Sequence, residues 1–206
     1  MNIVLVGAPL SGKGTQAELI SKNFDLVHIS IGDVFREIKG QNTPLGSLVN
    51  SYVSKAKLVP DDVTIKVLKE KLSTIPHKNG VLLDGFPRTL YQAQQLDNFL
   101  KIDAVVYLDV SLDSVLKRIE NRYVCSVCKK TNTAQNKLIP CIYCGGTLEK
   151  RADDSPETVR SRFKEFELFT QPVIDYYNSK QKLILIHGHK SMHEVFEDIK
   201  VKLEAL

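Results

Sequence analysis

The stretch Gly7-Ala8-Pro9-Leu10-Ser11-Gly12-Lys13-Gly14-Thr15 decides how this chain folds. It follows the short apolar, β-branched run at residues 2–6 and precedes residues 16–22, which have the composition of a helix. A strand, a glycine-rich loop and a helix N-terminus in this order predict a phosphate-binding loop. A glycine-rich turn that binds nothing is the alternative, and the flanking strand and helix argue against it.

Individual residues of this loop match the chemistry of a phosphate chain. Gly7 and Gly12 allow the backbone to turn tightly with its N–H groups pointing at an anion. Lys13 adds a positive charge for the β- and γ-phosphates, and Thr15 offers a hydroxyl for Mg²⁺. The general motif has Ser or Thr directly after the lysine, whereas Gly14 intervenes here, which makes this a more particular variant.

Composition places the chain among ordinary globular proteins. It has 206 residues, of which 43% are hydrophobic and 25% charged, enough for one α/β domain with a substantial core. No apolar run approaches the roughly 20 residues that span a membrane. A net charge of +4 suits an enzyme that collects phosphorylated substrates and does not single out nucleic acid. We therefore expect a cytoplasmic protein with no membrane or nucleic-acid partner. We also expect it to be a monomer.

Apolar strands alternating with helices predict the fold class. Further strands are expected at residues 26–30, 80–84, 104–110 and 182–186, giving a five-stranded parallel sheet with helices on both faces. Ligands bind at the carboxyl ends of such strands. The phosphate loop, Asp33, Asp84 with Arg88, and the loop after Ile186 all belong to that edge.

Two prolines and two carboxylates suggest where helices begin and break. Asp61 and Asp62 follow Pro60 and are expected to cap the next helix. Pro172 is expected to kink or interrupt a helix over residues 156–177.

The four cysteines lie in two C-x-x-C hooks separated by 12 residues: Cys125, Cys128, Cys141 and Cys144. This spacing predicts a closed, structural Zn²⁺ site of four thiolates. Two disulfides are the alternative, which a reducing cytosol disfavours. His187, His189 and His193 could form a second metal site, but a solvent-facing loop and helix start explain them better.

The chain resembles adenylate kinases of the nucleoside monophosphate kinase family. The matching segments are GAPLSGKGTQA, HISIGDVFR, KLVPDD, LLDGFPRTLYQAQQL and EKRADDSPETVRSRF. The resemblance implies a core domain of residues 1–29, 60–121 and 153–206, an AMP-binding segment at 30–59 and a lid of the bacterial zinc-bearing type at 122–152. It also implies reversible, Mg²⁺-dependent transfer of a phosphoryl group from ATP to AMP, giving two ADP.

The resemblance implies a role for each matched residue. The catalytic cations would be Lys13, Arg88, Arg122, Arg151 and Arg162. ATP would be bound by Leu10, Ser11, Gly12, Lys13, Gly14, Thr15, Arg118, Arg122, Thr131, Asn132 and Lys190. AMP would be bound by Ile31, Arg36, Lys57, Leu58, Val59, Gly85, Arg88, Gln92, Arg151 and Arg162. Mg²⁺ would be held by Thr15 and Asp84, directly or through water.

The expected chemistry agrees with this residue set. An AMP phosphate oxygen is already anionic, so the reaction needs in-line positioning and charge neutralisation rather than a general base. Arg118 and Arg122 are four residues apart, which predicts that they share one side of a helix and one wall of the site.

The chain departs from the family at three positions that bear on the site. Leu10 stands where the family usually has Gly, Ile31 where it usually has Thr, and Tyr123 where it has the second of two arginines. A UMP/CMP kinase is one rival interpretation, against which Gln92 and the long cysteine-bearing lid argue. A nucleic-acid-binding zinc ribbon is another, and it leaves Asp84, Arg88 and Gln92 unexplained.

Overall fold

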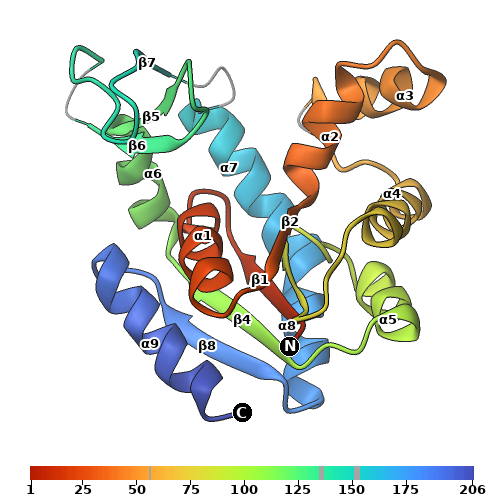
Figure 1. The fold of residues 1–206 in the computed structure, drawn as a ribbon. Helices are drawn as coiled ribbons and strands as arrows, with labels where there is room; N and C mark the ends of the chain where they lie inside the picture. Colours follow the sequence, from red (N-terminus) through yellow and green to blue (C-terminus); the bar gives the residue numbers. More distant parts are fainter. Residues whose placement is uncertain (56, 135–136, 151–153) are drawn as a thin grey trace.

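A five-stranded parallel sheet forms the centre of the computed structural model, which describes residues 1–55, 57–134, 137–150 and 154–206 (Figure 1). Its strand order is β2-β3-β1-β4-β8. The bounds are β1 Ile3–Gly7, β2 Val27–Ser30, β3 Val81–Asp84, β4 Ala104–Asp109 and β8 Leu183–His187. The predicted sheet is confirmed, and its central strand is β1, so the glycine-rich loop lies in the middle of the carboxyl edge.

Helices cover both faces of this sheet. Alternate residues of its strands point to opposite faces, and each set packs against a different group of helices. Ile3 and Leu5 pack with α1 (Lys13–Asn23) and α9 (Met192–Glu204). Val4 and Val6 belong to a second apolar cluster on the other face. That face is covered by α4 (Asp61–Thr74), α5 (Leu90–Phe99) and α8 (Gln171–Ser179). Continuous burial of β1 on both faces is what a parallel sheet requires.

Two further units project beyond the carboxyl edge, one on each side of the loop after β1 (Figure 1). One consists of α2 (Ile31–Lys39) and α3 (Pro44–Val53). The other is a small antiparallel sheet of order β6-β5-β7, with β5 Arg122–Cys125, β6 Thr131–Thr133 and β7 Leu148–Glu149. It is inserted between α6 (Leu112–Glu120) and α7 (Pro156–Glu165).

The expected break near Pro172 is confirmed in a specific form. A π-helical turn, Phe166–Thr170, joins α7 to α8, and the Gln171 N–H donates to the carbonyl five residues earlier, at Phe166. Proline lacks an N–H and cannot continue a regular α-helix, so the chain adopts this wider turn just before it.

The expected cap of α4 is wrong. Pro60 precedes the helix and no side chain caps it, while Asp61 and Asp62 lie in its first turn. The Asp61 carboxylate instead accepts hydrogen bonds from Oγ1 of Thr89, the N-cap of α5, at 2.8 Å and from Nε2 of Gln92 on α5 at 2.7 Å. The Asp61 carboxylate, which the local sequence predicts to be a helix cap, therefore bonds to residues 28 and 31 positions away instead.

None of the described helices is long and apolar enough to cross a membrane.

Candidate active site

The glycine-rich stretch forms the turn between β1 and α1, as predicted. Gly7 is required by space, because a Cβ there would lie 2.7 Å from Ser11 Oγ and 2.9 Å from the Leu108 carbonyl oxygen. Gly12 has φ +101°, a conformation that favours glycine. No side chain caps α1, so its first N–H groups have no side-chain acceptor, and such a helix end attracts anions.

Lys13 is folded back over this loop. Its Nζ donates to the carbonyl oxygens of Gly7 at 2.7 Å and Ala8 at 2.8 Å. Burial lowers the pKa of Lys13 to about 8, and the charges of Arg88 and Arg122 lower it further while Asp84 acts against them. A phosphate group in the loop would favour the protonated ammonium by adding negative charge beside it.

Asp84 brings a carboxylate to the same edge. It ends β3 and is paired in register with Leu5 of β1 and Ser30 of β2. Its side chain is mostly buried, and its carboxylate lies 3.8 Å from His28 Nε2. Thr15, in the first turn of α1, is half-buried. Carboxylate and hydroxyl oxygens are ligands that suit Mg²⁺, so the donor chemistry of this edge fits that ion.

Arg88 is held at both of its backbone groups. Its N–H donates to Gln92 Oε1 at 2.7 Å, and its carbonyl accepts from Thr170 Oγ1 at 3.0 Å. The side-chain Nε donates to the Gly85 carbonyl at 2.8 Å. The guanidinium reaches solvent, yet the surrounding protein lowers its pKa by desolvation, and the nearby Asp84 partly offsets this.

Arginines from three separate elements converge on this point. The charges of Arg162 on α7 and Arg36 on α2 both lower the pKa of Arg88, after desolvation and against Asp84. Such crowding of like charges lowers protein stability, and a polyanionic ligand relieves it. The sequence-predicted cations Lys13, Arg88, Arg122 and Arg162 therefore lie near enough to one another for their charges to interact.

The residues expected to bind AMP line the adjoining wall only in part. Ile31 is 2% exposed. A Cβ on Gly85 would lie 3.1 Å from Arg88 Nη2 and 3.4 Å from Ile31 Cγ2, so these three residues are neighbours. Arg36 forms an ion pair with Asp33. Burial would raise the pKa of that carboxyl, but hydrogen bonds from Arg36 and Ser30 and the charge of Arg36 hold it below its usual range.

Gln92, expected to read the AMP base, is engaged within the protein. It is 2% exposed, with its Oε1 on the Arg88 N–H and its Nε2 on Asp61. One Nε2–H remains for another acceptor. Among the other residues expected on this wall, Val59 is buried, Leu58 half-buried and Lys57 exposed.

Arg118 and Arg122 do not share a helix face, so that prediction is wrong. α6 ends at Glu120, and Arg122 is the first residue of β5. Arg122 Nη1 donates to both carboxylate oxygens of Asp154, at 3.0 and 3.2 Å. Arg118 Nη1 donates to the carbonyls of Leu10 at 3.1 Å and Ser11 at 2.9 Å. The helix stops before Arg122 because the chain there enters the ladder of the small sheet.

The remaining candidates are dispersed. Thr131 is exposed on β6, and Lys190 is exposed with its Nζ 2.6 Å from Asp198. Asn132 is buried and points at the cysteines: its Nδ2 donates to the Lys130 carbonyl and to Cys141 Sγ. Arg151 lies outside the described residues.

The four cysteine sulfurs form one cluster. All four Sγ atoms lie within 4.8 Å of one another, with Cys125 and Cys144 3.5 Å apart and Cys128 and Cys141 3.6 Å apart. All four thiols are free rather than disulfide-bonded. Tetrahedral Zn²⁺ with Zn–S bonds of about 2.3 Å places its sulfurs about 3.8 Å apart, so this cluster fits the ion. Among the described residues, this is the one such group of three or more His, Cys, Asp or Glu side chains; the three C-terminal histidines do not join one.

Hydrogen-bond donors favour the thiolate at two of these cysteines, Cys125 and Cys141, whose pKa values are both lowered. Burial alone would raise the pKa of Cys141, but donors from Tyr143, Asn132 and Cys144 outweigh it and lower that pKa to about 6. Cys125 receives N–H groups from Val127 at 3.4 Å and Cys128 at 3.5 Å. Hydrogen bonds that favour the thiolate favour the metal-binding form.

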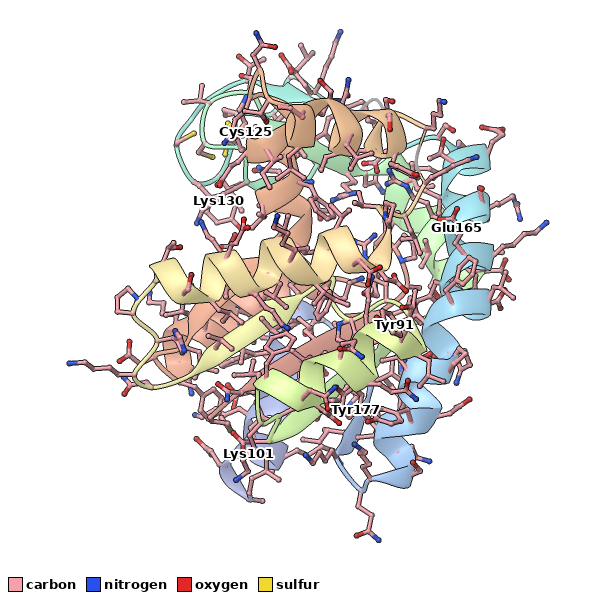
Figure 2. The ribbon with its side chains drawn as sticks, turned by 90° about the vertical axis from the view of Figure 1, so that its right-hand side faces the viewer. Tyr91, Lys101, Cys125, Lys130, Glu165 and Tyr177 are labelled. Carbon is pink, nitrogen blue, oxygen red and sulfur yellow. The ribbon has the colours of Figure 1, made fainter. Side chains whose placement is uncertain are left out.

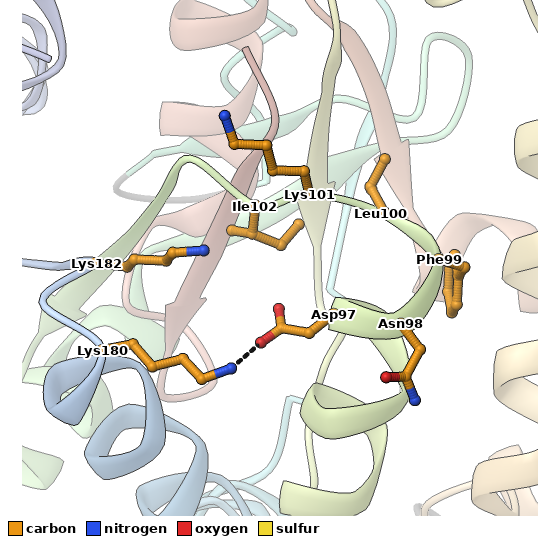
Figure 3. Close-up of a pocket in the computed structure, with 8 residues that line it drawn as sticks. All are labelled: Asp97, Asn98, Phe99, Leu100, Lys101, Ile102, Lys180 and Lys182. Carbon is orange, nitrogen blue, oxygen red and sulfur yellow. Dashed lines mark hydrogen bonds and ion pairs between the residues drawn. The ribbon is translucent and has the colours of Figure 1, made fainter.

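A hollow elsewhere in the molecule is separate from this site (Figure 3). It has a volume of about 320 Å³ and is lined by Asp97, Lys101, Ile102, Lys180, Lys182 and three neighbours. These residues precede β4 and β8, at the edge of the sheet opposite the glycine-rich loop. Figure 2 shows Cys125 and Tyr177, which donates to Asp97, toward opposite ends of the molecule.

Three site residues were missed in the sequence because their roles depend on distant partners. Asp61 holds Gln92, Thr170 holds Arg88, and Asp154 pairs with Arg122. The pairs are 31, 82 and 32 residues apart along the chain. Asp61 belongs to the segment KLVPDD, whose local pattern predicts a helix cap instead.

Comparisons with known proteins find one family and several relatives that span most of the chain. The sequence profile of the family described as "Adenylate kinase" matches residues 5–182. An adenylate kinase of Clostridium tetani is 44% identical, the match covering 100% of both chains. One of Caldanaerobacter subterraneus subsp. tengcongensis is 44% identical over 98% of this chain and 96% of its own. One of Bacillus velezensis is 42% identical over 100% of this chain and 99% of its own.

Proposed function

We propose roles for the residues of this site from one premise: the chain belongs to the adenylate kinase family. It is a phosphotransferase that converts ATP and AMP into two ADP, and the reverse. The convergence of Lys13, Arg88, Arg122 and Arg162 at the carboxyl edge supports the residue assignments below.

On the ATP side, the backbone of residues 10–15 holds the phosphate chain and Lys13 contacts its β- and γ-phosphates. Lys13 would leave the Gly7 and Ala8 carbonyls for the stronger acceptor that an anion provides. Mg²⁺, held through Thr15 and Asp84, supplies charge neutralisation when bound. Arg118, Thr131, Asn132 and Lys190 are proposed near the adenine end; the bonds of Asn132 to the cysteine cluster make it the weakest of the four.

On the AMP side, Arg36 and Arg88 bind the phosphate. The Arg88 side chain is already oriented by the Gly85 carbonyl and its backbone is held by Gln92 and Thr170, so less side-chain entropy is lost when it binds. Arg36 would exchange Asp33 for the AMP phosphate. The base would lie against Ile31, Leu58 and Val59.

Lys57, Gly85 and Gln92 complete this second subsite. Gly85 has φ +76°, and a side chain there would crowd Arg88, so glycine keeps the guanidinium accessible to a phosphate. Gln92 would use its remaining Nε2–H toward the base while Asp61 fixes its orientation.

During transfer, the catalytic groups bind and neutralise; none needs to remove a proton. The AMP phosphate oxygen attacks the γ-phosphorus in line, and ADP leaves. Lys13, Arg88, Arg122 and Arg162, joined by Arg151, stabilise the charge on the transferred group. A preorganised cluster of cations does this without reorganising during the reaction.

The elements that project beyond the carboxyl edge are proposed to close over the substrates. They correspond to the AMP-binding segment at 30–59 and the lid at 122–152, on a core of 1–29, 60–121 and 153–206. Closure would exclude water, which competes as phosphoryl acceptor. Two contacts of the lid support this: Arg122 at its start pairs with Asp154 just beyond its end, and Lys130 Nζ lies 3.3 Å from Glu18 on α1.

The cysteine cluster is proposed to bind a structural Zn²⁺ that holds the lid together. Apart from cysteines, only Tyr123, Ala134 and Leu148 form the apolar cluster of this sheet among the described residues. So small a core does not order such a segment without a metal. Free cysteines arranged as a metal site suit the reducing cytoplasm, where we propose that the enzyme works as a monomer on free nucleotides.

A coupled assay of phosphoryl transfer from ATP to AMP, CMP, UMP and GMP tests the proposal. We expect AMP to be the preferred acceptor. A folded, zinc-loaded enzyme that prefers CMP or UMP would show that Ile31 and Gln92 do not select adenine. An enzyme that transfers to none of the four would refute the assigned site.

A further inference from the structure

Leu10 has a backbone conformation that leucine seldom adopts. Its φ is +58°, in the left-handed region where an L side chain is crowded by its own backbone. Residues held in this way persist only when their surroundings impose the conformation, and they gather at functional sites. The contacts of Leu10 should therefore account for its positive φ.

The Leu10 side chain packs against an apolar cluster that belongs to the lid-bearing helices. The cluster consists of Val110 after β4, Val115 and Ile119 on α6, and Val159 on α7. Leu116 and Phe163 pack against it as well. Helices α6 and α7 are the two elements between which the cysteine-bearing sheet is inserted. Leu10 thus joins the phosphate loop to both ends of that insertion.

The backbone of the loop is tied to the same helix. Arg118 of α6 donates Nη1 to the carbonyls of Leu10 and Ser11, at 3.1 and 2.9 Å. Its Nη2 donates to the Gly188 carbonyl in the loop after β8. A Cβ on Gly188 would lie 2.5 Å from Val110 Cγ2, so this loop packs closely on the same cluster. The phosphate loop is therefore attached to α6 in two ways: the Leu10 side chain packs on its apolar cluster, and the loop carbonyls accept hydrogen bonds from Arg118.

We infer that Leu10 is a positioning residue, which fixes the phosphate loop to α6 and α7 so that the position of these helices sets the affinity of the loop for ATP. This rests on the proposed function for the assignment of the loop to ATP. A glycine at this position would allow the same φ without strain but would give the helices no side chain to hold. The packing of the Leu10 side chain between the phosphate loop and helices α6 and α7 thus offsets the backbone strain at Leu10.

The test measures ATP and AMP binding in the zinc-loaded enzyme with Leu10→Ala and Leu10→Gly. Both variants should weaken ATP binding about five- to tenfold, seen as Kd by calorimetry and as KM, and leave the KM for AMP within about twofold. Leu10→Gly should do so with little change in Tm, because relief of the left-handed strain offsets the lost packing.

Leu116→Ala is the matched control, since it truncates the same kind of side chain against the same cluster but on α6 rather than on the loop. It should lower Tm and leave the Kd for ATP within about twofold. Wild-type ATP affinity in both Leu10 variants would overturn the inference, as would an equal loss in Leu116→Ala. The proposed function fails separately, if the wild-type enzyme shows no turnover. ATP binding measured by calorimetry without AMP does not depend on turnover, so it tests the role of Leu10 by itself.

Discussion

Lys13→Met should abolish most activity and at the same time stabilise the protein at neutral pH. Lys13 carries its charge in a partly buried loop beside other cations, which lowers its pKa from 10.5 to about 8. Below pH 8 the lysine is charged in both states, and this pKa difference lowers the free energy of unfolding by about 3 kcal/mol relative to an uncharged side chain. Methionine has no charge to desolvate but loses the hydrogen bonds to Gly7 and Ala8. We therefore expect the free energy of unfolding at pH 7 to rise by about 1–3 kcal/mol.

The pH dependence follows from the sign of this change. Between about pH 8 and 10.5 the unfolded chain keeps the Lys13 proton that the folded chain has released. The unfolded state then binds more protons, so the stability of the wild type rises with pH across this window. Lys13→Met lacks this contribution, and its stability advantage should shrink toward pH 10.

Urea unfolding at pH 7 and pH 10, with the coupled assay, measures both effects. Turnover should fall about 100- to 1000-fold, since a cation that stabilises the transferred phosphoryl group is lost. Lys22→Met is the control, because it makes the same change at an exposed position of α1 and should alter neither quantity much. A Lys13→Met variant that is destabilised at pH 7, or that keeps wild-type turnover, would refute the reasoning.

Three further outcomes are expected. Thr170→Val should raise the KM for AMP about three- to tenfold and lower the free energy of unfolding by about 1 kcal/mol, because the Arg88 carbonyl loses its donor; Thr170→Ser should restore both, and an unchanged KM would contradict the role. Asp61→Leu should weaken discrimination between AMP and GMP by freeing Gln92, as measured by the ratio of their kcat/KM values; an unaltered ratio would show that the orientation of Gln92 does not select the base. Removal of the metal with a chelator should produce a separate low-temperature transition in calorimetry, from the cysteine-bearing sheet, before the main sheet unfolds; a single transition unaffected by the chelator would argue against the structural ion.

Much of the architecture could be predicted because its causes are local. Short apolar runs alternating with helical segments suffice for a parallel sheet, and the strands appear where they are expected. Gly7 and Gly12 mark the loop because few other residues fit their space or φ. The C-x-x-C hooks predicted a cluster because each hook brings two sulfurs together within one turn.

The predictions that were wrong concern residues whose partners are far away in sequence. Local sequence predicts that Asp61 caps a helix, yet its carboxylate accepts hydrogen bonds from Gln92 on α5 and from Thr89 just before it. The spacing of Arg122 from Arg118 predicts a shared helix, yet the helix ends before Arg122, which pairs in the small sheet. Local propensity is a weak preference, which tertiary hydrogen bonds worth about 1 kcal/mol or more readily override.

The sequence by itself therefore determined the sheet, the phosphate loop, the cysteine hooks and the kinase family, because each is written in spacing and residue type. Only the tertiary structure decided which cations lie near one another, what orients Arg88, and which helices Leu10 packs against. These depend on side chains that are far apart in the chain, as Leu10 is from the cluster that includes Val159 on α7. No local pattern encodes such a meeting, since it exists only once the helices have packed on the sheet.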